Sequence, residues 1–423
     1  MSKSGWKNIS NPKRKESFDS ETRDPSRDGL KAREGAALAV GIFSFRAAGE
    51  IIFGAGAIED AGAIVTRHGG KKILMVVDPG FAKAGSLEKI IEALKKEKLP
   101  HILFDAVEPE PRAEVADRCG ELAKKEKCDF VLGVGGGSAM DTAKAAAILA
   151  TNEGCARDFQ GLNKVPKPGL PKGMVPTTAG TGSEVTFTAV FINEEEKKKA
   201  GINSPFLYPE VSILDPELTL GLPAAVTAFT GMDALTHAIE SYTSKAANPM
   251  SEMFSAEAIR RIGKSLRQAV DQGSDLSART HMLFGSLLAG IGLANAGVTA
   301  AHSLAYPLGG IYRVPHGVAN ALLLPAVMEF NAFSSQEKFA RIAEMLGGKV
   351  EGLSVKEAAI LAVETVRRLA KDLGVPQRLS DLGIPEFVIP RMAEEAVKVA
   401  RPLENNPRPV SLAEVIRLYQ SVF

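Results

Sequence analysis

Four side chains of this sequence have the types and spacing of a metal site. Asp233 and His237, in "GMDALTHAIESY", are four residues apart and therefore lie on one face of a helix. His302 and His316 follow downstream, in "AHSLAYPLGGIYRVPHG". One carboxylate and three imidazoles form a complete ligand set for Fe²⁺ or Zn²⁺, and this set does not distinguish between the two ions. Each histidine taken singly is more often a hydrogen-bonded core residue, so the prediction rests on the four together.

Two loops have the composition of a nucleotide-binding site. In "VGGGSAMDTAK" (134–144) a strand runs through three glycines into a helix that begins near Ser138, and glycines let backbone N–H groups approach a phosphate. The pattern departs from GxGxxG because Ser138 occupies the third glycine position. In "PTTAGTGSEVT" (176–186) threonine and serine hydroxyls accompany the glycines. Each loop alone could be an ordinary turn, whereas two such loops favour a dinucleotide over a single phosphate.

Asp78 ends an early strand and has two interpretations. Its carboxylate could accept hydrogen bonds from an adenosine ribose, which would favour NAD because the 2′-phosphate of NADP would meet a like charge. Alternatively, Asp78, Pro79 and Gly80 could simply form a turn. The residues themselves leave both interpretations open.

Alternating strands and helices must position these groups. We expect strands in "KKILMVVD" (71–78), "HILFDAV" (101–107) and "CDFVLGVGGGS" (128–138), with helices over 86–99, 114–127 and 139–150. This alternation predicts βαβ units and a parallel sheet with helices on both faces. After about residue 219 the strand signals nearly stop and successive helices follow.

The chain is long enough for two hydrophobic cores. We predict an α/β dinucleotide-binding domain over 43–221 and an all-helical metal-binding domain over 222–423, with the active site in the cleft between them. The segment 1–42 begins with a polar stretch nearly free of aliphatic residues, so we expect it to be a disordered extension.

Composition narrows the function classes. A formal net charge of +1 and an aromatic content of 6% give no reason to bind nucleic acid or an anionic membrane. No apolar run reaches the roughly 20 residues of a membrane-spanning helix. Three cysteines without a CxxC spacing do not form a disulfide framework, which suits a reduced cytoplasmic protein.

The motifs occur in an order that resembles the iron-dependent (group III) alcohol dehydrogenases. They are GGGS-x-x-D-x-A-K, P-T-T-A-G-T-G-S-E-V-T, D-A-L-T-H-A-I-E, A-H-x-x-x-x-P-L-G-G and P-H-G-V-A-N-A. The resemblance runs from about residue 43 to the C-terminus. It implies the architecture of that family, shared with dehydroquinate synthases, and a metal-dependent transfer of hydride between a primary or secondary alcohol and NAD. It also implies a homodimer or a larger homo-oligomer.

The resemblance assigns roles residue by residue. It implies that Asp233, His237, His302 and His316 bind the metal, Fe²⁺ or alternatively Zn²⁺. It implies cofactor contacts from Asp78, Gly135, Gly136, Gly137, Ser138, Ala139, Thr177, Thr178, Thr181 and Lys199.

Two positions depart from the family pattern. Tyr306 stands where many members have a histidine proposed to relay the alcohol proton, and we assign Tyr306 a catalytic place although a phenol is a poorer base than imidazole at neutral pH. Glu110 stands where many members have an asparagine near the cofactor. The Tyr306 form of the motif is similar to that of hydroxyacid–oxoacid transhydrogenases and 4-hydroxybutyrate dehydrogenases, so a hydroxy acid is the alternative substrate, with Arg313 as a candidate partner for its carboxylate.

Overall fold

The computed structural model describes residues 41–83, 85, 87–193 and 198–423. The predicted disordered extension, 1–42, therefore lies almost wholly outside the described residues. Residues 43–423 form one compact unit. Within this unit the strands precede the long helices, while the division of the chain at residue 221 stays a prediction.

A six-stranded parallel sheet forms the core of the first part. Its order is β1–β9–β6–β4–β2–β3, and every neighbouring pair runs parallel. The strands are β1 (Glu50–Phe53), β2 (Ile73–Val77), β3 (His101–Phe104), β4 (Phe130–Gly135), β6 (Lys172–Pro176) and β9 (Val211–Leu214). The chain reverses direction across the sheet between β2 and β4, where the carboxyl ends of two parallel strands leave a crevice that commonly binds ligands.

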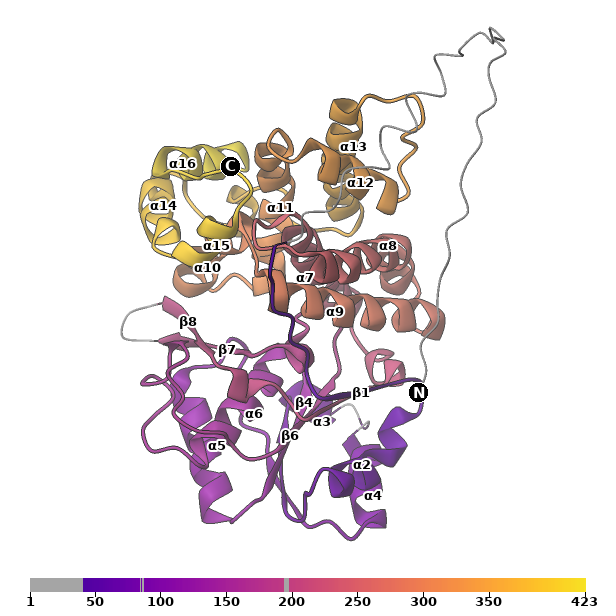
Figure 1. Cartoon of the computed structure of the whole chain (residues 1–423), viewed down its shortest axis with the longest axis vertical. Coiled ribbons are helices and arrows are strands. Elements are labelled where there is room, and N and C mark those ends of the chain that lie inside the picture. Colours follow the sequence, from indigo (N-terminus) through magenta and orange to yellow (C-terminus); the bar gives the residue numbers. More distant parts are fainter. Residues whose placement is uncertain (1–40, 84, 86, 194–197) are drawn as a thin grey trace, which may run out of the picture. The chain divides into compact units, whose positions relative to one another are not determined.

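Alternating side chains of the central strands fill two cores, one on each face of the sheet. Met75 and Leu132 pack with α2 and α4 on one face, while Leu74 and Val131 pack with α5 and α6 on the other. Figure 1 shows the two helix pairs on opposite sides of the strands. The helices are α2 (Ala61–Arg67), α3 (Pro79–Lys83), α4 (Leu87–Lys96), α5 (Ala113–Lys125) and α6 (Gly137–Leu149). The predicted α/β architecture is confirmed.

A second, smaller sheet was not predicted. It has the order β5–β8–β7 and consists of β5 (Gly161–Leu162), β7 (Thr188–Asn193) and β8 (Lys198–Asn203). β7 and β8 pair antiparallel, and β8 contacts α10 (Ala300–Tyr312) of the helical part. This small sheet therefore links the hydroxyl-rich loop at 176–186 to the region that carries the histidines.

Beyond Leu214 the described chain contains no further strand, as predicted. The helices of this part are α7 (Ala224–Thr243), α8 (Pro249–Asp271), α9 (Leu276–Ala296), α10 (Ala300–Tyr312), α11 (His316–Ala332), α12 (Gln336–Met345), α13 (Val355–Asp372), α14 (Ile389–Val397), α15 (Ala400–Asn405) and α16 (Leu412–Ser421). Helices α7, α8 and α9 pack closely on one another. Among the described residues, no single helix is long and apolar enough to cross a membrane. Helices α9 and α10 together have the length and apolar composition of a span, but the chain bends by 103° between them.

Candidate active site

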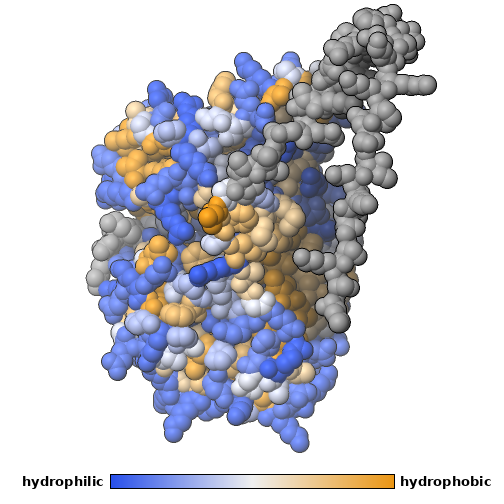
Figure 2. All heavy atoms as spheres, in the orientation of Figure 1, coloured by the Kyte–Doolittle hydropathy of each residue, from blue (hydrophilic) through white to orange (hydrophobic). Residues whose placement is uncertain are grey.

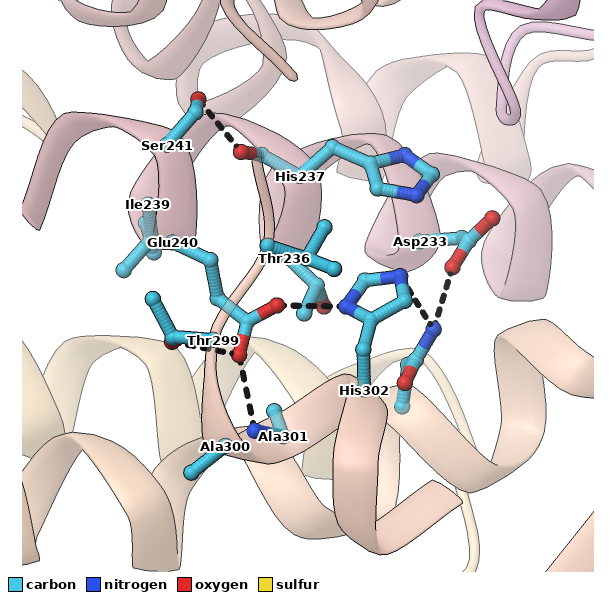
Figure 3. A network of polar contacts seen from close by, with 12 residues as sticks. Asp233, Thr236, His237, Ile239, Glu240, Ser241, Thr299, Ala300, Ala301 and His302 are labelled. Atoms are coloured by element: carbon cyan, nitrogen blue, oxygen red, sulfur yellow. Dashed lines mark hydrogen bonds and ion pairs between the residues drawn. The ribbon is translucent and has the colours of Figure 1, made fainter. Parts of the chain in front are cut away.

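The four predicted metal ligands converge from three helices. Asp233 and His237 lie one turn apart on α7, His302 lies in the first turn of α10, and His316 is the first residue of α11. One ligand atom from each of the four lies within 4.8 Å of the others. Figure 3 shows Asp233 and His237 of α7 facing His302 from the helix below. Residues up to 83 positions apart in sequence thus form one cluster of possible ligand atoms.

Hydrogen bonds orient two of the imidazoles. Nδ1 of His302 lies 2.5 Å from Oε2 of Glu240, and Nδ1 of His237 lies 3.3 Å from the backbone carbonyl of Gly180. Both partners are acceptors, so each Nδ1 carries the proton. The Nε2 atoms of both rings therefore keep a lone pair.

The contacts of Asn320 on α11 indicate that the cluster suits a cation. Its Nδ2 donates to Oδ1 of Asp233 at 2.7 Å and lies 3.1 Å and 3.2 Å from Nε2 of His302 and His316. Its own Oδ1 is buried and has no hydrogen-bond partner in the part of the chain that the structure describes. The acceptor lone pairs therefore converge on a point that only a hydrogen-bond donor or a cation can occupy. A donor set of three nitrogens and one oxygen fits Fe²⁺ or Zn²⁺.

The protonation states also suit a metal. Burial lowers the pKa of His237, and burial lowers that of His316 to about 3. Burial opposes ionisation of Asp233, but the neighbouring histidines and the Asn320 amide hold its pKa at about 2. At neutral pH His237 and His316 are therefore neutral imidazoles and Asp233 is a carboxylate, which are the forms that bind metal.

A cavity of about 460 Å³ opens onto the cluster. Its wall includes all four cluster residues, as well as Gly137, Ser138, Thr181, Lys199 and Tyr306 from the predicted cofactor and catalytic sets. The other predicted cofactor residues do not line this cavity. Residues of the α/β part and of the helical part thus share one cavity.

The two predicted loops pack against each other beside the cavity. A Cβ on Gly137 would lie 2.7 Å from Cγ2 of Thr181, and one on Gly136 would lie 3.5 Å from Oγ1 of Thr178. Thr177 donates its N–H to the carbonyl of Gly135, which continues the pairing of β4 with β6. Helix α6 begins at Gly137, so its first N–H groups, those of Ser138 and Ala139 included, face this crevice without intrahelical partners.

Asp78 forms the turn that the sequence allowed, while its contact with a ribose stays a prediction. Its Oδ1 accepts the N–H groups of Gly80 and Phe81, as a turn residue does. It also lies at the carboxyl end of β2 beside the glycine loop, because a Cβ on Gly135 would lie 2.8 Å from that of Asp78. Gly135 has a φ of 148°, which favours glycine, and the missing side chain permits the close approach.

Lys199 has an unexpected partner. Its ammonium group is almost fully buried and forms an ion pair with Glu110, whose Oε1 also accepts the N–H of His316 at 3.3 Å. Glu110 has a φ of 52°, a left-handed conformation that is uncommon for a residue other than glycine. This acid therefore connects the α/β part to the start of α11.

Tyr306 lines the cavity that the four possible metal ligands also line. Burial raises the pKa of Tyr306, and the charges of Glu110 and Asp141 add to the effect. The phenol is therefore protonated at neutral pH and can donate a hydrogen bond into the cavity. Arg313 is exposed at the end of α10 and does not line this cavity, whereas Arg401 does.

Sequence reasoning assigned no role to several residues of the quoted motifs. Asp141 accepts from the hydroxyl of Ser183 at 2.5 Å, and the buried Lys144 donates to the carbonyl of Ser183 at 2.9 Å. These contacts fix the hydroxyl-rich loop to α6. Glu240 and Asn320, which surround the histidines, were missed in the same way. Their place inside the motifs was the available signal, but only the folded chain shows their partners.

Comparison with known proteins agrees with this geometry. The sequence profile described as "Iron-containing alcohol dehydrogenase" matches residues 48–216, and that of the "Fe-containing alcohol dehydrogenase family, C-terminal" matches residues 227–423. The chain therefore belongs to the iron-containing alcohol dehydrogenase family, and it is an oxidoreductase that acts on alcohols and aldehydes.

The chain aligns with individual relatives over almost their whole length. A 1,3-propanediol dehydrogenase of Citrobacter freundii is 44% identical over 373 residues, which are 88% of this chain and 96% of the relative. An NAD-dependent methanol dehydrogenase of Bacillus methanolicus is 35% identical over an alignment that covers 88% of this chain and 97% of that enzyme. A crystal structure of a 1,3-propanediol oxidoreductase superposes with a TM-score of 0.88 at 43% identity, over 90% of this chain and all of that one.

Proposed function

We propose that this chain is a metal- and NAD-dependent alcohol dehydrogenase that interconverts a small primary or secondary alcohol with its aldehyde or ketone. The observation that carries the proposal is the single cavity that four possible metal ligands share with the glycine loop. A hydride transfer needs its donor and acceptor side by side, and this cavity offers one space for both.

Asp233, His237, His302 and His316 would hold the metal, with Fe²⁺ as first choice and Zn²⁺ as alternative. When bound, the metal supplies Lewis acidity toward the alcohol oxygen, and NAD supplies the hydride acceptor. The protein lowers the pKa of His237 and His316, so that both imidazoles are neutral, and keeps Asp233 ionised. The catalytic partners are therefore arranged before substrate enters.

The cofactor would lie along the two packed loops. Backbone N–H groups of residues 135–139 would receive the pyrophosphate, helped by the partial positive charge of the α6 N-terminus. Thr177, Thr178 and Thr181 would add hydroxyl contacts, and Lys199 would contact the end of the cofactor nearest the cluster. Asp78 beside Gly135 supports NAD rather than NADP.

Tyr306 would act on the substrate from the cavity wall. Because its phenol is protonated at neutral pH, we assign it a hydrogen bond to the substrate oxygen rather than the role of a general base. The relative that is named a 1,3-propanediol dehydrogenase supports a small diol or alcohol as substrate.

A hydroxy acid is the second candidate, either in a 4-hydroxybutyrate-type dehydrogenase or in a hydroxyacid–oxoacid transhydrogenase. The residue that favours it is Arg401 on the cavity wall, which could pair with a carboxylate. Arg313 no longer supports this candidate, since it lies outside the cavity.

We also propose a homodimer or larger homo-oligomer in the cytoplasm. β1 is an edge strand of the sheet, and Phe43 shortly before it is 40% exposed. Figure 2 shows hydrophobic residues gathered across the middle of the face in view, between hydrophilic zones at both ends. A second copy of the chain would cover such a surface. The three cysteines are free thiols, as expected in a reducing compartment.

The test is an anaerobic NAD⁺ reduction assay followed at the absorbance of NADH. The full chain is stripped of metal, reloaded with Fe²⁺ or Zn²⁺, and offered 1,3-propanediol, 1-butanol and 4-hydroxybutyrate. We expect metal-dependent NADH formation with an alcohol. Hydride transfer from 4-hydroxybutyrate to an added oxoacid without free NADH would instead select the transhydrogenase, and no transfer in any mixture despite bound metal would contradict both candidates.

A further inference from the structure

We infer that Glu240 is a positioning residue that fixes the tautomer of His302 and provides the second negative charge of a neutral, buried metal site. The inference rests on the proposed metal site, and it assigns a function to a residue that does not touch the metal. Glu240 is only 2% exposed and lies on α7, one turn after His237.

Both oxygens of Glu240 are occupied by donors. Oε2 lies 2.5 Å from Nδ1 of His302, while Oε1 accepts from the hydroxyl of Thr299 at 2.7 Å and from the N–H of Ala301 at 2.7 Å. Figure 3 shows the carboxylate between the His302 ring and the first turn of α10. Glu240 thus fixes the ring and the helix turn that carries it.

The contacts on the two sides of the ring require the same tautomer. Glu240 accepts at Nδ1, and the amide Nδ2 of Asn320 donates toward Nε2 from 3.1 Å. A proton on Nε2 would face this donor and leave Nδ1 to repel the carboxylate. Only the form with Nδ1–H satisfies both neighbours, and this form directs a lone pair into the cluster.

Charge gives Glu240 a second function. Glu110 also contacts a cluster residue from outside, and it is matched by the ammonium group of Lys199. Among the described residues, Asp233 and Glu240 are then the two buried carboxylates at the cluster that no lysine or arginine cation matches, and together they balance one divalent ion. The positive end of the α10 dipole helps to keep Glu240 ionised.

Glutamine cannot replace this residue, because the site needs an acceptor at each end of the side chain. An amide has one acceptor oxygen and one NH₂ group. If the oxygen faces His302, the NH₂ group meets the N–H of Ala301. If the NH₂ group faces His302, it donates to Nδ1 and forces the proton onto Nε2, where the metal should bind.

The experiment compares metal affinity in the full chain. Zn²⁺ is withdrawn from the loaded protein by a competing chromophoric chelator in the wild type, Glu240→Gln, Thr299→Val and His302→Ala. Thr299→Val is the matched control, since it removes one donor from the same carboxylate but leaves the Nδ1 acceptor. We expect Glu240→Gln to bind about 10- to 100-fold more weakly and Thr299→Val to remain within about threefold of the wild type.

Other outcomes distinguish a failure of the inference about Glu240 from a failure of the proposed metal site. Wild-type affinity in Glu240→Gln, or equal losses in Glu240→Gln and Thr299→Val, would overturn the inference, since an equal loss reports packing alone. Wild-type affinity in His302→Ala would overturn the metal site itself and the inference with it. If Glu240→Gln does not fold, ¹⁵N NMR of histidine in the wild-type Zn²⁺ form decides: Nδ1 protonated supports the inference, and Nδ1 bound to metal contradicts it.

Discussion

The cluster of four possible metal ligands and the two loops, 134–144 and 176–186, line one cavity but are built in opposite ways. The cluster consists of side-chain donors whose partners surround them, as Glu240 and Asn320 surround His302. The loops work through missing side chains: Gly135 and Gly137 have no room for a Cβ beside Asp78 and Thr181. Removing a donor side chain should therefore impair the cluster, whereas adding a Cβ to one of these glycines should impair cofactor binding by the loops.

The largest effect is expected where a cluster donor is deleted. His316→Ala should lower the rate of NAD⁺ reduction by at least about a thousandfold, because Lewis-acid stabilisation contributes several kcal/mol to the transition state. The check is kcat together with metal content. His101→Ala, on β3 away from the cavity, is the control. An equal loss of rate in this variant would show that the effect of His316→Ala is not specific to the cluster.

A buried acid within the hydroxyl-rich loop affects stability instead. Burial raises the pKa of Glu184 from 4.5 to about 7, and its Oε1 has no hydrogen-bond partner among the described residues. The folded chain thus holds this proton more tightly than the unfolded chain, so this group's contribution is fully present below about pH 4.5 and is lost as pH rises through about 7.

Glu184→Gln cannot ionise and should not lose this contribution. Relative to the wild type, its free energy of unfolding should rise by about 3 kcal/mol between pH 5 and pH 8. Urea unfolding at the two pH values measures the difference. Glu92→Gln on the exposed face of α4 is the control, and a difference that does not change with pH would show that Glu184 does not hold its proton.

Adding one methyl group tests the loops. Gly137→Ala would place a Cβ 2.7 Å from Cγ2 of Thr181 and push the two loops apart. We expect KM for NAD⁺ to rise about tenfold with unchanged metal content, because a lost contact of this kind is worth about 1.4 kcal/mol. Gly221→Ala, with nothing within 4 Å of the new Cβ, should behave as wild type. A fall in metal content with a normal KM for NAD⁺ would contradict this assignment, because it would show that the loop supports metal binding rather than cofactor binding.

The smallest effect is expected at Tyr306. Tyr306→Phe removes one hydroxyl from the cavity wall and should lower kcat by a factor of about five to ten, the cost of one neutral hydrogen bond. Because the pKa of the phenol is raised, the pH profile of kcat between pH 6 and 9 should keep its shape. Loss of an ionisation from that profile in the variant would show that Tyr306 acts as a base.

The two regions also differ in what their sequence reveals. Asp233, His237, His302 and His316 were predicted as a set because metal-binding side chains are rare in apolar helices, and the structure brings all four together. Parallel strands and amphipathic helices were predicted because their periodicity is local. The ion pair of Lys199 with Glu110 and the acceptor role of Glu240 were not, because they depend on contacts between residues 60 or more positions apart.

The central claim is that one divalent metal lies among Asp233, His237, His302 and His316. The most direct measurement is anomalous diffraction at the iron or zinc absorption edge from crystals of the metal-loaded full chain. The account predicts one strong peak bounded by a carboxylate oxygen of Asp233 and a ring nitrogen of each histidine. A peak elsewhere in the cavity, or none at this cluster in protein that carries one metal per chain, would contradict it.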